Sequence, residues 1–182
     1  MRVIEVTADY TNLIASTDYQ EFLRYDGSDQ SNILPGLVES AIRQAEAYCN
    51  ATFGDKTYEV YFDDVCAGKW YRLPYGPVQS VDAVSELTAV DGDVPTESAI
   101  TTGFNISPAK DEIKFHLTGD YKVEYTAGIA TPANVNEQVK EAILKILSEN
   151  FDNRESILVG ESVANVPRTA KVLLAPFRQK LL

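Results

Sequence analysis

The side chains that could support catalysis are few, and they do not form a recognisable set. The single histidine, His116, lies between Phe115 and Leu117 in a run typical of a β-strand. A histidine in that setting is more often a satisfied or exposed structural residue than a catalytic base. Cys49 or Cys66 could be paired with it as a nucleophile, but no third group that would orient the histidine can be named. The sequence therefore argues against an enzyme.

The sequence also offers little evidence for a site that binds a metal ion or phosphate. Asp63 and Asp64 are adjacent carboxylates that could hold a divalent cation, but paired acids at a strand end are usually solvated. The segment 67–69, Ala-Gly-Lys, lacks the leading glycine and the Ser or Thr of a phosphate-binding loop. Paired cysteine or histidine ligands for zinc are also missing. We therefore expect no metal and no cofactor.

The two cysteines carry little information about function. Cys49 lies on the apolar face of a predicted helix, where a buried free thiol is the usual state. A disulfide between Cys49 and Cys66 is an open alternative that nothing in the sequence requires.

Composition places the chain among soluble globular proteins. It has 182 residues, of which 45% are hydrophobic and 24% charged. No stretch approaches the roughly 20 apolar residues of a membrane span, and residues 1–5 do not begin a signal peptide. We expect synthesis in the cytoplasm and no membrane association.

The net charge of −11 is unevenly distributed. Residues 1–56 carry −5, residues 57–126 carry −7 and residues 127–182 carry +1, while residues 167–182 hold four cations and no acid. A protein this acidic does not bind nucleic acid over a broad face. Its basic end could contact phosphate or an acidic partner surface, or it could be a solvated helix end whose cations suit the helix dipole.

Helical periodicity appears at both ends of the chain. Thr17 and Gln20 form a capping-box pattern that predicts a short helix through Arg24, and a long helix follows over about 32–53 with Gly54 as its C-cap. Apolar residues at spacings of three and four predict another helix after a cap at Asn134: Val135, Val139, Ala142, Ile143, Ile146, Leu147 and Phe151.

Between these helices the period changes to that of strands. Apolar and polar residues alternate in several short runs between about residues 57 and 126, separated by turn residues, which predicts five or six antiparallel strands. Aromatic residues crowd into one part of this block, where they either fill a sandwich core or form an interface patch: Tyr58, Tyr61, Trp70, Tyr71 and Tyr75.

The predicted fold is therefore α+β, with an α-helical core and an inserted antiparallel β-sheet or sandwich. Two long helices plus short N- and C-terminal helices make up the core. We assign residues 1–56 to its N-terminal part, residues 57–126 to the β insert, and residues 127–182 to its C-terminal part and a tail.

A series of short motifs in this order resembles a known family. The series is 23–27 (LRYDG), a long helix ending near Tyr48, 73–78 (LPYGPV), 123–128 (VEYTAG) before 131–132 (TP), 151–155 (FDNRE) and 173–178 (LLAPFR). This arrangement resembles the head–tail connector proteins (adaptor or head-completion proteins) of tailed bacteriophages, in their longer form with a β insert. The likeness spans about residues 10–182.

The resemblance implies a structural virion protein of the head–tail neck. Such proteins form a homo-oligomeric ring, usually dodecameric, that docks beneath the portal protein, extends the DNA channel and offers a platform to a neck, stopper or tail protein. DNA passes through the channel without specific binding. The implied portal-docking residues are Val172, Leu173, Leu174, Phe177, Arg178, Leu181 and Leu182, and the implied subunit-interface residues are Asn153, Arg154 and Glu155.

Physical reasoning about the tail points the same way. Exposed leucines on a cationic tail are costly unless a partner covers them, and Pro176 should end the last helix near Ala175. Loop 156–167 has little to bury, so we expect it to be mobile until assembly. The alternatives are another neck or tail-completion ring protein, a DNA-binding module that uses the Arg168 to Lys180 cluster, and an unrecognised enzyme.

Overall fold

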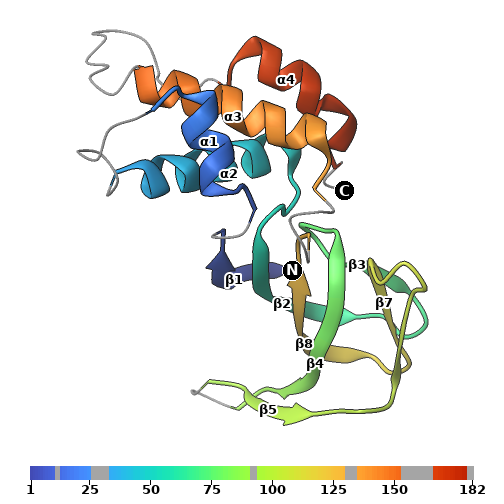
Figure 1. Ribbon diagram of the computed structural model, residues 1–182. Helices are drawn as coiled ribbons and strands as arrows, with labels where there is room; N and C mark the ends of the chain where they lie inside the picture. Colours follow the sequence, from blue (N-terminus) through green and yellow to red (C-terminus); the bar gives the residue numbers. More distant parts are fainter. Residues whose placement is uncertain (11–12, 26–32, 91–93, 130–134, 153–165, 180–182) are drawn as a thin grey trace, which may run out of the picture. The chain divides into compact units, whose positions relative to one another are not determined.

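The computed structural model describes residues 1–10, 13–25, 33–90, 94–129, 135–152 and 166–179. They divide into two compact units. The β unit comprises Met1–Asp9 and Gly54–Ala130, and the helical unit comprises Tyr10–Phe53 and Thr131–Leu182. Figure 1 shows the strands of the first unit and the helices of the second. The mixed α+β class that the sequence predicts is confirmed.

The β unit contains two antiparallel sheets. The larger has the strand order β1-β2-β8-β4-β5 and the smaller the order β3-β7-β6. The strand bounds are β1 Arg2–Asp9, β2 Asp55–Val65, β3 Trp70–Arg72, β4 Val78–Thr88, β5 Thr96–Ala99, β6 Phe104–Ile106, β7 Glu112–Phe115 and β8 Gly119–Ala127. Strand β2 alternates buried and less buried residues as the sequence predicts, and the central strand β8 does so except at Lys122, which is also buried.

Aromatic rings fill the core between the two sheets. Phe115 of the smaller sheet stacks on Tyr121 of the larger one at 4.1 Å between centroids, and Phe62 meets Tyr71 edge-on at 5.6 Å. The buried Tyr125 hydroxyl donates to the Pro74 carbonyl oxygen at 2.6 Å, which satisfies its polar end. The crowded aromatics of the sequence thus serve mainly as core, although Trp70 remains 41% exposed.

The helical unit packs α3 (Glu137–Asp152) against both α2 (Leu34–Cys49) and α4 (Arg168–Leu174). Figure 1 shows these helices together with the short α1 (Ser16–Phe22). Ala41, Ile42 and Ala45 of α2 are fully buried, as are Ile143 and Ile146 of α3. The predicted apolar stripes therefore form the contact. No helix in the described part of the chain is long and apolar enough to cross a membrane.

Several predicted boundaries were wrong. Residues 1–9, assigned from the sequence to the helical part, belong to the β unit, where Arg2–Asp9 forms β1. Helix α1 begins after Ala15 without a side-chain cap, so the capping box at Thr17 does not form. The C-cap of helix α2 is Asn50, four residues before the expected Gly54, because Asn50 adopts the left-handed conformation (φ 50°, ψ 36°) that terminates helices.

The start of α3 also differs in detail from the prediction. The expected cap, Asn134, lies outside the described residues. Asn136 instead accepts a hydrogen bond from the Gln138 backbone N–H at 2.9 Å through its Oδ1 atom. This contact satisfies one of the free donors in the first turn of a helix.

Candidate docking surface

Helix α4 has one face in the core of the helical unit and one face in solvent. Ala170 and Leu174, four residues apart and therefore on the same face, are fully buried, whereas Val172 is 69% exposed. Leu173 is half-buried. Of the residues that the resemblance assigns to portal docking, Leu174 is thus a core residue of this unit. Val172 is the apolar side chain that α4 presents outward.

The chain after α4 is tied to the C-terminal end of α2. A 3-10 turn, η2 (Ala175–Phe177), contains Pro176, so the helix ends where the proline predicts. The Gln179 backbone N–H then donates to the Cys49 carbonyl oxygen at 2.7 Å, and Asn50 Nδ2 donates to the Gln179 carbonyl oxygen at 3.4 Å. The segment up to Gln179 is therefore anchored and does not form a loose tail.

Arg178 adds a second kind of contact at the same place. Its guanidinium carbon lies 5.3 Å from the centre of the Tyr48 ring, a cation–π arrangement. Burial raises the pKa of the neighbouring Cys49 thiol to about 11, and the positive charge of Arg178 opposes this shift. Sequence analysis named Arg178 but missed its partners, because helical spacing alone does not show that the tail returns to the end of α2.

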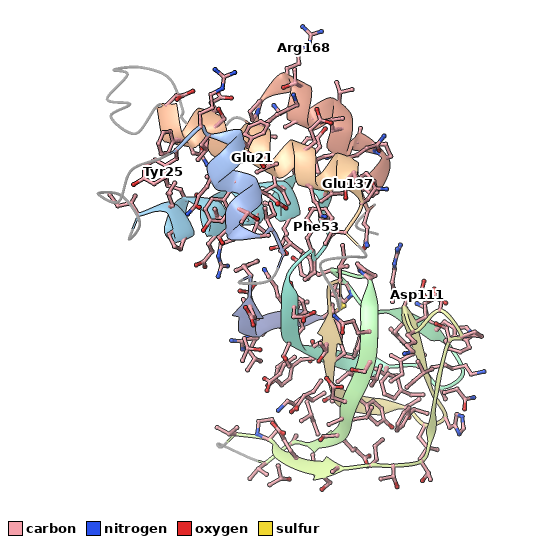
Figure 2. All side chains as sticks on the ribbon, in the orientation of Figure 1. Glu21, Tyr25, Phe53, Asp111, Glu137 and Arg168 are labelled. Atoms are coloured by element: carbon pink, nitrogen blue, oxygen red, sulfur yellow. The ribbon has the colours of Figure 1, made fainter. Side chains whose placement is uncertain are left out.

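The exposed side of this segment is basic. Arg168, Lys171 and Arg178 are its cations, and residues 166–179 contain no acid. Figure 2 shows Arg168 extending away from the start of α4. None of the three forms an ion pair with a carboxylate of the described residues. We call the following residues the C-terminal surface: Arg168, Lys171, Val172, Leu173, Phe177 and Arg178.

Other predicted site residues lie outside the described part of the chain. The implied interface residues Asn153, Arg154 and Glu155 follow the end of α3 and are among them, as are Leu181 and Leu182. The same is true of residues 156–165, for which mobility was expected. The described structure therefore bears on the docking residues only from Val172 to Arg178.

The residues considered for catalysis or metal binding are dispersed. His116 follows the end of β7 at Phe115, so it does not lie in the predicted strand; it is exposed, and its backbone N–H donates to the Gly103 carbonyl oxygen at 2.8 Å. Both cysteines are free, Cys49 buried and Cys66 exposed. Asp63 lies 3.4 Å from the N-terminal amine. Within the described residues no three His, Cys, Asp or Glu side chains gather where they could hold a metal ion.

Comparison with solved structures finds chains of the same fold. Three of them come from structures described as the neck of an empty gene transfer agent (GTA) particle computed with C6 symmetry, the virion of a native GTA particle, and the neck of a native GTA particle computed with C12 symmetry. Each is 17% identical and covers 100% of this chain and 97% of its own, with TM-scores of 0.76, 0.75 and 0.76. No protein-family model matches the chain, and no curated protein matches it either.

Proposed function

We propose that this protein is a structural component of the neck of a phage-like particle, and that it forms the adaptor ring beneath the portal. The observation that carries the proposal is the full-length likeness of fold to GTA neck and virion chains, with TM-scores of 0.75 to 0.76. A likeness over both units is more informative than one over a single common motif, because it includes the way in which the chain alternates between them.

The proposed assembly is a ring of twelve copies. The related neck structures were computed with C6 and C12 symmetry, which supports a cyclic arrangement for this chain. The ring would carry DNA through its centre without specific contacts, in keeping with the net charge of −11. Its far side would receive a downstream neck, stopper or tail protein.

The C-terminal surface is the proposed contact with the portal. It combines the exposed apolar side chain of Val172 with unpaired cations, and the anchor to α2 holds it in place before any partner arrives. A pre-formed surface loses little conformational freedom on binding, so more of the contact energy appears as affinity. The portal should offer an apolar socket with an acidic rim.

The test is the native mass of the protein, alone and mixed with its cognate portal. Truncation after Ala170 would remove the core residue Leu174, so a point change in the surface is a better probe. Val172→Asp should weaken portal binding at least about tenfold, because burying a valine contributes roughly 1.5–3 kcal/mol. Val94→Asp is the matched control, since Val94 is 78% exposed in the β unit; it should bind as the wild type does.

The outcomes separate the alternatives. Portal binding that Val172→Asp weakens at least about tenfold and Val94→Asp leaves unchanged supports the adaptor role and its docking site. If the wild-type protein does not bind the portal but binds a tail-side protein, it is another neck or tail-completion component. Binding to DNA with a steep salt dependence would instead identify a DNA-binding module.

A further inference from the structure

The two outer faces of the β unit carry opposite charge. On the smaller sheet, Tyr71 pairs with Ile113 and both face the core, so the flanking cross-strand pairs face outward. These outward pairs are Trp70 with Lys114 and Arg72 with Glu112. This outer face therefore holds two cations, one carboxylate and the exposed indole of the chain's single tryptophan.

The cations of this face are free to meet a partner. Lys114 Nζ lies 4.9 Å from the centre of the Trp70 ring, and neither Lys114 nor Arg72 forms an ion pair with any described carboxylate. Trp70 is 41% exposed. Tryptophan and arginine are the residue types most enriched where protein interfaces concentrate their binding energy. We call these residues the basic face: Trp70, Arg72, Glu112 and Lys114.

The outer face of the larger sheet is acidic. At its centre the Lys122 ammonium contacts three carboxylates, those of Glu124 at 2.9 Å and of Glu59 and Glu97 at 3.1 Å each. One ammonium cannot neutralise three carboxylates, so the cluster keeps two negative charges. Asp82 adds another carboxylate, held by the Thr126 hydroxyl at 2.7 Å.

The remaining charges on this side do not change its sign. The β-strand register also places Arg2 and Asp120 outward on this sheet, opposite Tyr61 and Leu87 respectively. Their charges cancel, and Asp9 and Asp55, which are opposite each other in the register on the same face as Glu59, add two more carboxylates, so this side is negative overall. We call these residues the acidic face: Arg2, Glu59, Asp82, Glu97, Asp120, Lys122 and Glu124.

We propose that the basic face of one copy docks on the acidic face of the next copy in the ring. The core lies between the two sheets, so the two faces are on opposite sides of the sandwich. A two-fold contact that joined like face to like face would oppose equal charges, which is unfavourable. A head-to-tail contact pairs opposite charges, and repeated head-to-tail contacts close into a ring.

This inference rests on the proposed function, because it names the subunit contact of the proposed ring. Trp70 is its anchor, and the excess carboxylates around Lys122 are the partners for Lys114 and Arg72. The charges set the orientation of neighbouring copies, and the Trp70 indole, which docking would bury, contributes most of the apolar contact.

Charge reversal tests the contact. Lys114→Glu alters the basic face, and Glu97→Lys alters the acidic face while Lys122 keeps two of its carboxylates. Each single variant should raise the protein concentration needed for half-maximal ring formation on the cognate portal by about tenfold. The double variant, and an equimolar mixture of the two single variants, should recover most of the loss. Lys110→Glu, the same charge change outside both faces, should assemble normally.

A second readout follows Trp70 itself. With 5-fluorotryptophan incorporated at position 70, the fluorine resonance should shift on assembly of the wild type, because the indole leaves water. The shift should be absent in Lys114→Glu at a concentration where rings do not form. Circular dichroism of each variant establishes that it is folded, so a lost ring is not mistaken for a lost fold.

The outcomes distinguish this inference from the proposed function. Rings that form equally well from all variants, or a fluorine resonance unchanged by assembly, overturn the inference and leave the adaptor role standing. A loss in Lys114→Glu with none in Glu97→Lys also overturns it, since the basic face would then meet a different acidic partner. A wild-type protein that stays monomeric and does not bind its portal overturns both.

Discussion

Replacing Gly128 with alanine should destabilise the β unit more than any ordinary surface change. Gly128 follows β8 with φ +122°, a region that side chains rarely occupy. A Cβ atom there would overlap the Gly54 carbonyl oxygen and lie 2.8 Å from the Gly54 carbonyl carbon. Both obstacles are backbone atoms, so no side-chain rotation relieves the overlap. The start of β2 or the end of β8 must move.

The size of the effect follows from these two causes. A positive φ costs a non-glycine residue about 1–2 kcal/mol, and forced backbone shifts cost about 1–3 kcal/mol. We therefore expect Gly128→Ala to lower the free energy of unfolding by about 2–5 kcal/mol. The hydrogen bond from the Gly128 N–H to the Pro77 carbonyl oxygen, 2.8 Å long, should weaken with it.

The assay is urea unfolding followed by the fluorescence of Trp70, which reports on the β unit. Gly68→Ala is the matched control, because Gly68 has φ +78° but nothing within 4 Å of the added Cβ. Gly68→Ala should lower the free energy of unfolding only by the cost of a positive φ, about 1–2 kcal/mol. Equal losses in the two variants would refute the reasoning, since the overlap with Gly54 would then contribute nothing.

Four further predictions concern the cysteines, Lys122 and Asn136. At pH 8 the native protein should react with a thiol reagent at Cys66 alone, and at both cysteines after unfolding. Burial raises the pKa of the Cys49 thiol from 9.0 to about 11. The stability that the buried, protonated thiol contributes is therefore present below pH 9 and is lost as the pH rises toward 11. Between these pH values the free energy of unfolding should fall less steeply with pH in Cys49→Ala than in the wild type. Lys122→Met should lower the free energy of unfolding by about 1–3 kcal/mol at pH 7, because three carboxylates lose their shared cation; urea unfolding measures the loss. Asn136→Ala should cost about 1 kcal/mol in thermal unfolding, because the Gln138 N–H loses its acceptor.

The sequence predicts the buried strands well because half-burial imposes a two-residue period. Tyr58, Val60 and Phe62 face the core as their alternation indicates. Strand β1 lacks that signal, because as an edge strand it keeps most of its side chains exposed, and β-branched residues fall on both of its faces. Pairing with β2 defines it, and pairing between distant segments leaves no local pattern.

The candidate surface could be predicted only in part, for a related reason. Apolar residues near the end of the chain signal burial, but they do not say whether the burial lies within the fold or against a partner. Leu174 is buried within the helical unit and Val172 is exposed, although they are two residues apart. Which of the two residues is buried depends on where α2 and α3 pack, and the sequence of the tail alone does not show this.

The alternation of the chain between its two units has a consequence for how it is made. The β unit needs β1 from the beginning of the chain and β8, which ends at Ala127, whereas α2 must wait for α3 and α4. During synthesis, which runs from the N-terminus, the β unit can therefore close while the apolar face of α2 is still uncovered. In the ribosome-bound intermediate, the apolar face of α2 stays exposed while about fifty further residues are made. A chaperone would be most needed at this stage of synthesis.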